Sequence, residues 1–189
     1  IFYEYTSKAE PNDAHRILAR LEAEGRLAFL VTQNIDGLQE AAGSRALAEF
    51  HGSCRHLVCL DCGTRVEAEP ALLADLPPQC RCGGIFKPGF VFFGEGIPRN
   101  AYEASFAAAE TADACLVIGS TGEVYPAAEI PRIAKRRGGL VVEIDPEPTG
   151  FTESVTDIFI RAGASEAMRE LDRVVCGRWT VDSGQWTEL

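Results

Sequence analysis

Four of the seven cysteines fall into two close pairs, and this spacing constrains the fold more than any other feature of the chain. Two residues separate Cys59 from Cys62, seventeen separate Cys62 from Cys80, and one separates Cys80 from Cys82. Two short thiolate turns that face each other supply the tetrahedral sulfur shell that Zn²⁺ prefers. A redox pair is the main alternative, but these cysteines do not precede the helix of a βαβ unit as a thioredoxin-type pair does. We predict one structural zinc ion, because four protein ligands leave no position for an activated water.

The second pair is irregular, because a single residue between Cys80 and Cys82 gives a tighter turn than two residues would. Cys54 lies nearby in the sequence as a spare thiol and is an alternative ligand, although the four paired cysteines remain the expected set. An odd number of cysteines, with four of them clustered, favours metal binding in a reducing compartment over a disulfide framework. We therefore expect a cytoplasmic protein.

Apolar runs alternate with helical patterns on both sides of the cysteine region. Strands that alternate with helices form βαβ units around a parallel sheet, so the chain is predicted to be an α/β protein. Residues 53–97 change character and indicate a small inserted module. Strands are expected at residues 27–33, 114–120, 140–145 and 157–162, and the first two are expected to be buried. Helices are expected at residues 11–25, from about Gly37, at residues 126–139 and at residues 165–174. The first of these helices should bury one face, formed by Ala14, Ile17, Leu18 and Leu21.

The charge and hydropathy of the chain exclude two classes of partner. The net charge of −10 argues against a nucleic-acid-binding surface, which needs a basic face to neutralise phosphates. No apolar stretch approaches the ~20 residues of a membrane span, and no signal peptide is visible. We therefore expect neither nucleic acid nor a membrane as a partner.

The segment TQNIDGLQEAAG, residues 32–43, places three polar side chains directly after the apolar run of residues 27–31. In an open α/β sheet, ligands bind at the carboxyl ends of the strands, so Gln33, Asn34 and Asp36 are candidates for ligand binding. The same side chains could instead cap the helix that begins near Gly37, and this stretch alone favours capping.

Two further stretches have both a structural and a functional interpretation. His51 lies in the glycine-containing turn EFHGS, at the junction of the two predicted subdomains, where clefts usually form. A histidine there could accept a proton near neutral pH, although its position alone favours no chemical role. The stretch KPGFVFFGEGIP, residues 87–98, is either a core strand followed by a turn or an open edge that pairs with a peptide.

These residues together resemble the sirtuins, the NAD-dependent protein deacylases. The matching pieces occur in family order over residues 11 to about 170: PNDAH, TQNIDGLQEAAG, EFHGS, the four cysteines, CGGIFKP, VFFGE, IGSTGEVYPAAEIP and VVEIDPEPT. The resemblance implies a Rossmann-like NAD-binding domain formed by residues 1–52 and 98–175, a small zinc-binding module at residues 53–97, and a tail at residues 176–189. The resemblance places the reaction in the cleft between the NAD-binding domain and the zinc-binding module.

The resemblance also implies a reaction and the residues that carry it out. The amide oxygen of an acyl-lysine attacks C1′ of the nicotinamide ribose, and nicotinamide leaves to give an alkylimidate. His51 acts as general base on the ribose hydroxyls, while Asn34 and Asp36 position the ribose and the leaving carboxamide. The products are free lysine, nicotinamide and O-acyl-ADP-ribose. The implied cofactor-binding residues are Gln33, Asn34, Ile35, Asp36, Gly119, Ser120, Thr121, Asp145, Pro146, Glu147 and Ala164, and the implied peptide-binding residues are Val91, Phe92, Phe93, Gly94, Glu95 and Val124.

Three expectations concern the limits of this activity. A neutral acyl group such as acetyl is expected, because Tyr3 is not followed by the arginine of the desuccinylase-type members. The family's Gly-Ala-Gly loop and Pro-Asp-Phe-Arg segment do not occur in the sequence, so we expect an upstream glycine-rich segment in the working protein and no activity of these 189 residues alone. Two alternatives stay open, protein mono-ADP-ribosyl transfer and a non-catalytic zinc-bearing interaction module.

Overall fold

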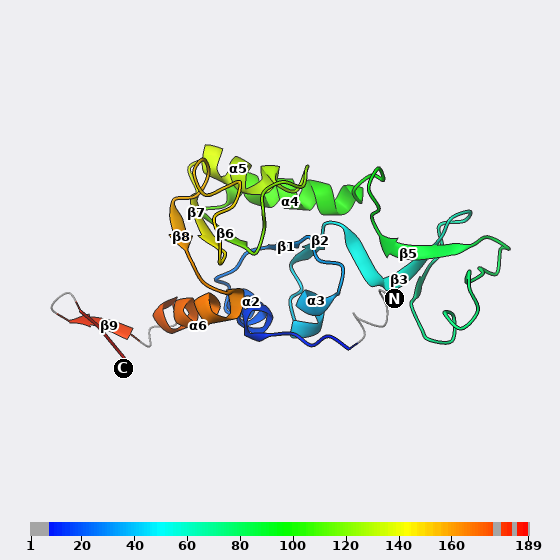
Figure 1. Cartoon of the computed structure of the whole chain (residues 1–189), viewed down its shortest axis with the longest axis horizontal. Helices are drawn as coiled ribbons and strands as arrows, with labels where there is room; N and C mark the ends of the chain where they lie inside the picture. The colour runs from blue at the N-terminus through cyan, green and yellow to red at the C-terminus, as the bar shows by residue number, and fades with distance from the viewer. Residues whose placement is uncertain (1–7, 176–178, 183–184, 189) are drawn as a thin grey trace. The chain divides into compact units, whose positions relative to one another are not determined.

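The computed structural model describes residues 8–175 and the backbone of residues 179–182 and 185–188 (Figure 1). The described residues pack as two compact units. The first contains Phe29–Ser105 and the residues before Pro11, and the second contains Pro11–Ala28 and the chain from Phe106 onward. Among the described residues, no helix is long and apolar enough to cross a membrane.

The second unit is built on a three-stranded parallel sheet, as the alternation of strands and helices predicts. Its strands are β6 (Ala114–Ile118), β7 (Leu140–Ile144) and β8 (Ile158–Ile160), with β7 in the centre. Helix α5 (Glu129–Arg136) connects β6 to β7 and is shorter than the predicted helix at residues 126–139. One face of the sheet packs into a core cluster formed by Val117, Ala128, Val141, Phe151 and Val155.

Strand β6 is less buried than its apolar sequence suggests. Side chains of a strand alternate between its two faces, and only Val117 of β6 is buried in the core. Leu116 is 37% exposed on the other face, and Cys115 is half-buried against the core cluster. The expectation of a fully buried strand was therefore wrong for β6.

Helices α2 (Asp13–Ala23) and α6 (Ala164–Val175) lie side by side in the second unit (Figure 1). Asn12 begins α2 with a capping box, because its side chain accepts the His15 N–H while the His15 ring accepts the Asn12 N–H. The buried face of α2 is the predicted one and consists of Ala14, Ile17, Leu18 and Leu21. An ion pair between Arg20 and the buried Asp172 joins the two helices.

The first unit contains a parallel pair of strands, β1 (Leu30–Thr32) and β2 (Leu47–Glu49), with the short helix α3 (Leu38–Ala42) between them in the chain. Strand β1 is shorter than predicted, and only Leu30 of its residues is buried. The sequence patterns did not indicate β2. They also missed helix α4 (Arg99–Thr111), although its sequence is rich in alanine and glutamate, which favour helices. The helix begins in the first unit and ends in the second.

An antiparallel sheet forms the cysteine-containing part of the first unit. Strand β3 (Gly52–Cys59) lies between β4 (Arg65–Glu67) and β5 (Phe86–Phe90). Its small core cluster consists of Leu57, Cys59, Ala68 and Phe86. In the tail, where no motif was recognised, β9 (Trp179–Asp182) and β10 (Gln185–Glu188) pair as an antiparallel hairpin.

Candidate functional site

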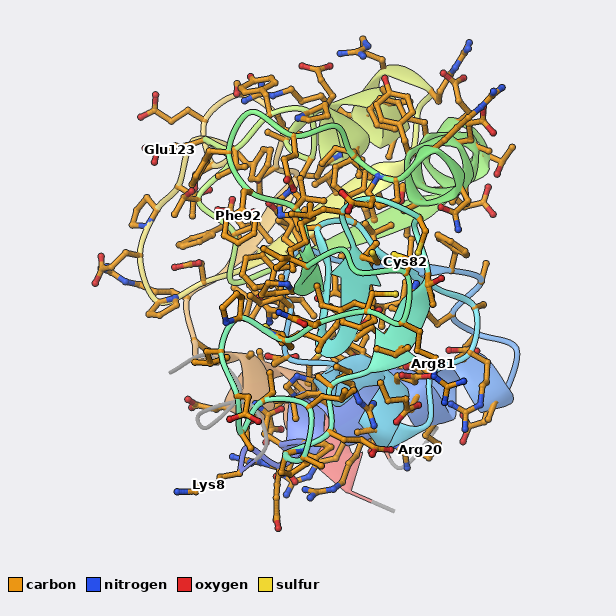
Figure 2. All side chains as sticks on the ribbon, turned by 90° about the vertical axis from the view of Figure 1, so that its right-hand side faces the viewer. Lys8, Arg20, Arg81, Cys82, Phe92 and Glu123 are labelled. Atoms are coloured by element: carbon orange, nitrogen blue, oxygen red, sulfur yellow. The ribbon has the colours of Figure 1, made fainter. Side chains whose placement is uncertain are left out.

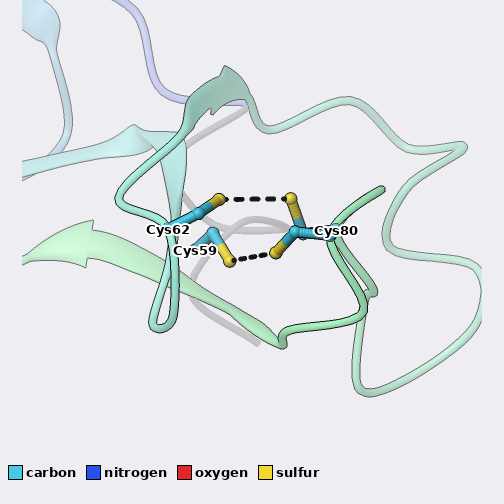
Figure 3. A group of neighbouring side chains, drawn as sticks. Cys59, Cys62 and Cys80 are labelled. Atoms are coloured by element: carbon cyan, nitrogen blue, oxygen red, sulfur yellow. Dashed lines mark hydrogen bonds between the residues drawn. The ribbon is translucent and has the colours of Figure 1, made fainter.

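The structure brings the four paired cysteines together at the end of the antiparallel sheet (Figure 3). Their sulfur atoms lie within 4.8 Å of one another, with Cys59 Sγ 3.6 Å from Cys82 Sγ and Cys62 Sγ 3.7 Å from Cys80 Sγ. Zinc–thiolate bonds of about 2.3 Å place the sulfurs of a tetrahedral site ~3.8 Å apart. The four thiols therefore fit one zinc ion. Cys54 is buried in β3 and is not a member of the described cluster.

A neighbouring hydroxyl favours the thiolate form of Cys62, the form that binds metal. The Thr64 hydroxyl lies 3.1 Å from Cys62 Sγ, and this hydrogen bond is the main cause that lowers the pKa of Cys62 to about 6. The Gly84 N–H donates to Cys82 Sγ at 3.4 Å, so the tight second turn orients its sulfur with a backbone donor. Figure 2 shows Arg81 and Cys82 on this turn, before β5 begins.

His51 lies in the turn that leads from β2 into β3, within the first unit. The imidazole donates a hydrogen bond to the backbone carbonyl of Gln33, which leaves the other ring nitrogen to accept a proton. Burial is the main cause that lowers the pKa of His51 below its ordinary value of 6.5, so the ring is neutral at pH 7. The fully buried Phe50 contacts the ring edge-to-face, with 5.5 Å between centroids.

The backbone after His51 passes too close to β5 for any side chain. A Cβ at Gly52 would lie 2.3 Å from the carbonyl oxygen of Gly89, and Gly52 also has a φ of +71°. The Val91 N–H donates to the His51 carbonyl at 2.8 Å. The histidine turn is therefore held against the chain that continues from β5, and glycine at position 52 permits this close approach.

The segment after β1 shows the structural one of the two roles that its sequence left open. Asp36 Oδ1 accepts the Leu38 N–H at 2.9 Å, so this carboxylate does order the first turn of α3. The Cys54 N–H donates to the Ile35 carbonyl at 2.8 Å and joins the segment to β3. Asn34 is exposed, and its side chain is free to meet a ligand while its N–H donates to Thr32 Oγ1 at 3.1 Å. Local capping by Asp36 and ligand binding by Asn34 are compatible.

Residues 91–95 form a turn after β5, so the stretch of residues 87–98 is a strand followed by a turn, the first of the two alternatives that its sequence left open. The Glu95 N–H donates to the Phe92 carbonyl at 2.9 Å, and Gly94 has a φ of +91° that an extended strand does not allow. Phe93 at the tip is 101% exposed and Phe92, labelled in Figure 2, is 44% exposed. The turn therefore presents two aromatic side chains outside the core.

Lys87, which the sequence patterns did not single out, fastens this turn to β5. Its ammonium group donates to the Phe90 carbonyl at 3.1 Å and to Glu95 Oε2 at 2.7 Å, and it lies 5.0 Å from the centroid of the Phe92 ring. The same Glu95 oxygen accepts the Phe92 N–H at 3.0 Å. The hydrogen bond from Lys87 is the main cause that lowers the pKa of Glu95, so the pair is ionised at neutral pH.

Replacement of Lys87 by methionine is expected to loosen this turn without unfolding the sheet. Methionine keeps the length of the side chain but loses the charge-assisted hydrogen bonds, so we expect the backbone amides of residues 92–95 to exchange hydrogen roughly fivefold faster. Amide hydrogen exchange of the folded protein measures this change. Arg99→Met, which removes the exposed Arg99–Glu103 ion pair of α4, is the matched control and should leave the exchange of these residues unchanged. An unchanged exchange rate in folded Lys87→Met protein would contradict the expectation.

The other predicted cofactor-binding residues belong to the second unit. Gly119, Ser120 and Thr121 follow β6, and Asp145, Pro146 and Glu147 follow β7, so both segments lie at the carboxyl ends of adjacent parallel strands. This edge of a parallel sheet is where α/β proteins bind ligands. The Gly119 N–H donates to the Ile144 carbonyl at 3.0 Å and joins the two segments.

Side chains around Asp145 order the second of these segments. Asp145 Oδ1 accepts the Glu147 N–H at 3.0 Å, and Arg161 donates to the Pro146 carbonyl at 3.0 Å and pairs with the Glu147 carboxylate. The two remaining predicted residues of this unit are separate from both segments in the chain. Val124 is 40% exposed, and Ala164 begins α6.

Parallel strands with ordered polar segments at their carboxyl ends, together with a four-thiolate metal module, define an α/β protein of the nucleotide-binding class with a structural metal site. The Sir2 family model matches residues 2–126 of the chain. The NAD-dependent protein deacylase of Thermococcus kodakarensis is 44% identical over 175 residues, which cover 89% of this chain and 68% of that protein. The chain belongs to the Sir2 family.

Solved structures agree with this assignment. A Sir2 homologue in complex with NAD has a TM-score of 0.88 and 40% sequence identity, and the match covers 92% of this chain and 68% of that one. A Sir2 complex with a p53 peptide and NAD⁺ has a TM-score of 0.84 and 32% identity, and the match covers 93% of this chain and 77% of that one. The predicted Rossmann-like fold with a zinc-binding module is thereby confirmed.

Proposed function

We propose that the protein is an NAD-dependent protein deacylase that releases nicotinamide and O-acyl-ADP-ribose from NAD and an acyl-lysine substrate. The observation that carries this proposal is the histidine turn, in a chain 44% identical to a protein deacylase. His51 is neutral at pH 7, has one ring nitrogen bound to the Gln33 carbonyl, and comes from the segment next to the predicted ribose-binding residues. A histidine held in this way suits a general base.

NAD would supply an activated C1′ carbon, with nicotinamide as the leaving group, for the acyl oxygen of the substrate. The residues present fit this chemistry, because Gln33 to Asp36 and His51 lie within one compact unit. The His51 ring accepts the proton of a ribose hydroxyl, and the Gln33 carbonyl keeps the ring in the tautomer that can accept it. Asn34 and Asp36 orient the ribose and the leaving carboxamide.

The two cofactor-binding segments of the second unit would bind the rest of NAD. The hydroxyls of Ser120 and Thr121 suit the ribose and phosphate groups, and the free carboxylate oxygen of Asp145 suits a ribose hydroxyl. The other predicted contacts to NAD are those of Ile35, Gly119, Pro146, Glu147 and Ala164.

The turn at residues 91–95 would bind the backbone of the substrate peptide, with a contribution from Val124. Its Phe92 and Phe93 are exposed, so their rings can pack against a peptide that lies along the turn. We propose a neutral acyl group such as acetyl. The four-thiolate site would hold one structural zinc ion, and reduced zinc-binding thiols suit a cytoplasmic location.

Mass spectrometry of an acetyl-lysine peptide tests this function, with these 189 residues extended at the front by the glycine-rich segment of a Sir2 relative. We expect loss of the acetyl group only when NAD is present, with equimolar release of nicotinamide. The same peptide with an unmodified lysine is the control and should release no nicotinamide. Gain of ADP-ribose on the peptide without acetyl loss would instead favour mono-ADP-ribosyl transfer, and absence of any NAD turnover would contradict the proposal.

A further inference from the structure

A buried carboxylate occupies strand β7 at a position where its neighbours are apolar. Glu143 is 1% exposed. In the chain it follows the buried Val141 and comes two residues before Asp145, where the cofactor-binding segment begins. Alternation along the strand places Glu143 on the same face as Val141, whose side chain belongs to the core cluster. A buried carboxylate is strongly destabilising unless its oxygens accept hydrogen bonds. The hydrogen-bond partners of the Glu143 carboxylate therefore indicate its role.

Three threonine hydroxyls satisfy this carboxylate. Thr149 bonds to Glu143 Oε1, Thr152 lies 3.1 and 3.0 Å from the two carboxylate oxygens, and Thr156 Oγ1 lies 2.6 Å from Oε2. Two of these hydroxyls also accept backbone N–H groups, since Phe151 N donates to Thr149 Oγ1 at 3.1 Å and Thr149 N donates to Thr152 Oγ1 at 2.8 Å. All three hydroxyls direct their protons to Glu143, and those of Thr149 and Thr152 each receive a backbone donor as well.

This arrangement closes the segment that follows β7. Glu143 precedes the predicted cofactor residues Asp145–Glu147 in the chain and Thr149 follows them, so one side chain bonds across both ends of the segment. The closed segment also contacts the other cofactor-binding segment of the same unit. The Gly150 N–H donates to the Thr121 carbonyl at 2.9 Å, and a Cβ at Gly122 would lie 3.0 Å from the buried ring of Phe151.

We propose that Glu143 is a positioning residue for NAD, which holds both cofactor-binding segments in their binding conformation without touching the cofactor itself. This inference rests on the proposed function. A segment that is already ordered loses less conformational entropy when a ligand binds, so its affinity for the ligand is higher. Glu143 and its three threonines therefore set the affinity for NAD, whereas the peptide-binding turn belongs to the other unit and is independent of them.

The variant Glu143→Gln tests the proposal, because glutamine keeps the volume of the side chain but turns a donor toward hydroxyls that are already donating. We expect the KM for NAD to rise roughly tenfold, with kcat and the peptide KM within about twofold of the wild type. Isothermal titration with ADP-ribose should show the same loss of affinity. Thr156→Val, which removes one donor, should change the NAD affinity in the same direction by a smaller factor.

Amide hydrogen exchange without any ligand gives a readout that does not depend on activity. Residues 145–151 should exchange at least about tenfold faster in Glu143→Gln than in the wild type. Asp172→Asn is the matched control, because Asp172 is a buried carboxylate of the same unit that pairs with Arg20 between α2 and α6. It should lower the melting temperature and leave the NAD KM unchanged.

The outcomes separate this proposal from the proposed function. Equal NAD affinity in the wild type and in folded Glu143→Gln would overturn the positioning role alone. Parallel losses of NAD affinity in Glu143→Gln and Asp172→Asn would also overturn it, since they would reflect general destabilisation. Failure of the wild-type protein to bind NAD or ADP-ribose would overturn the proposed function and this proposal together.

Discussion

Replacement of His51 by alanine is expected to lower the rate of deacylation by about 10²–10⁴-fold, the usual contribution of a general base. The imidazole is fixed by the Gln33 carbonyl and has one ring nitrogen available for a proton, so its loss removes the proton acceptor. Affinity for NAD and for the peptide should change little, because the base acts on a proton transfer and not on the bound ground state. Single-turnover kinetics and isothermal titration measure the two effects separately.

The pH dependence of the wild-type enzyme provides an independent check. A general base works in its neutral form, and burial lowers the pKa of His51 below 6.5. The kcat/KM should therefore fall only as the pH decreases through this lowered pKa, on the acid side of 6.5. His56→Ala, which removes a histidine of β3 outside the turn, is the control and should keep both rate and profile. A loss below about tenfold in His51→Ala would remove His51 from the role of general base.

Removal of zinc is expected to unfold the antiparallel sheet of the first unit and to abolish activity. Its core cluster consists of only four buried residues, and one of them is the ligand Cys59. Structural zinc contributes an apparent ~10–16 kcal/mol to folding in zinc-finger peptides, far more than so small a core provides. A strong chelator should therefore abolish both the near-ultraviolet circular dichroism of the sheet and the deacylation.

Metal analysis of freshly purified, reduced protein should return about one zinc per chain. Cys59→Ser should reproduce the effect of the chelator, because serine is a poor zinc ligand. Cys115→Ala removes a thiol that lies outside the cluster and should retain both zinc and activity. Protein that contains no zinc and is still folded and active would refute the metal site.

The sequence predicted those features that depend on residues close together in the chain. The cysteine spacing indicated the metal cluster, and the apolar face of α2 was predicted residue by residue because a helical period places Ala14, Ile17 and Leu18 on one side. Strand β2 was not predicted, because a three-residue strand is too short to show a period. The turn after β5 was one of two alternatives for residues 87–98, but the Lys87–Glu95 pair that fastens it was not predicted.

Site residues that act through others are harder to recognise than those that would touch a ligand. Glu143 did leave a signal, a charged residue inside the apolar run LVVEI, but the pattern could not say which groups would satisfy it. The three threonines lie six, nine and thirteen residues further along the chain, and only folding brings them to one carboxylate. Hydrogen-bond partners at such separations are properties of the tertiary structure.

Strand β3 limits where residues can be inserted into this protein or deleted from it. The strand begins one residue after His51 and ends at Cys59, and it is paired on both sides. Insertion or deletion of one residue between Leu57 and Cys59 would move Cys59 to the opposite face of the sheet, because side chains alternate along a strand. Residues 69–77 belong to no strand and form no bridge to the sheet, so they have no such restriction. Insertions in relatives of this protein should therefore accumulate in that stretch, while the number of residues between His51 and the first metal ligand, Cys59, stays constant.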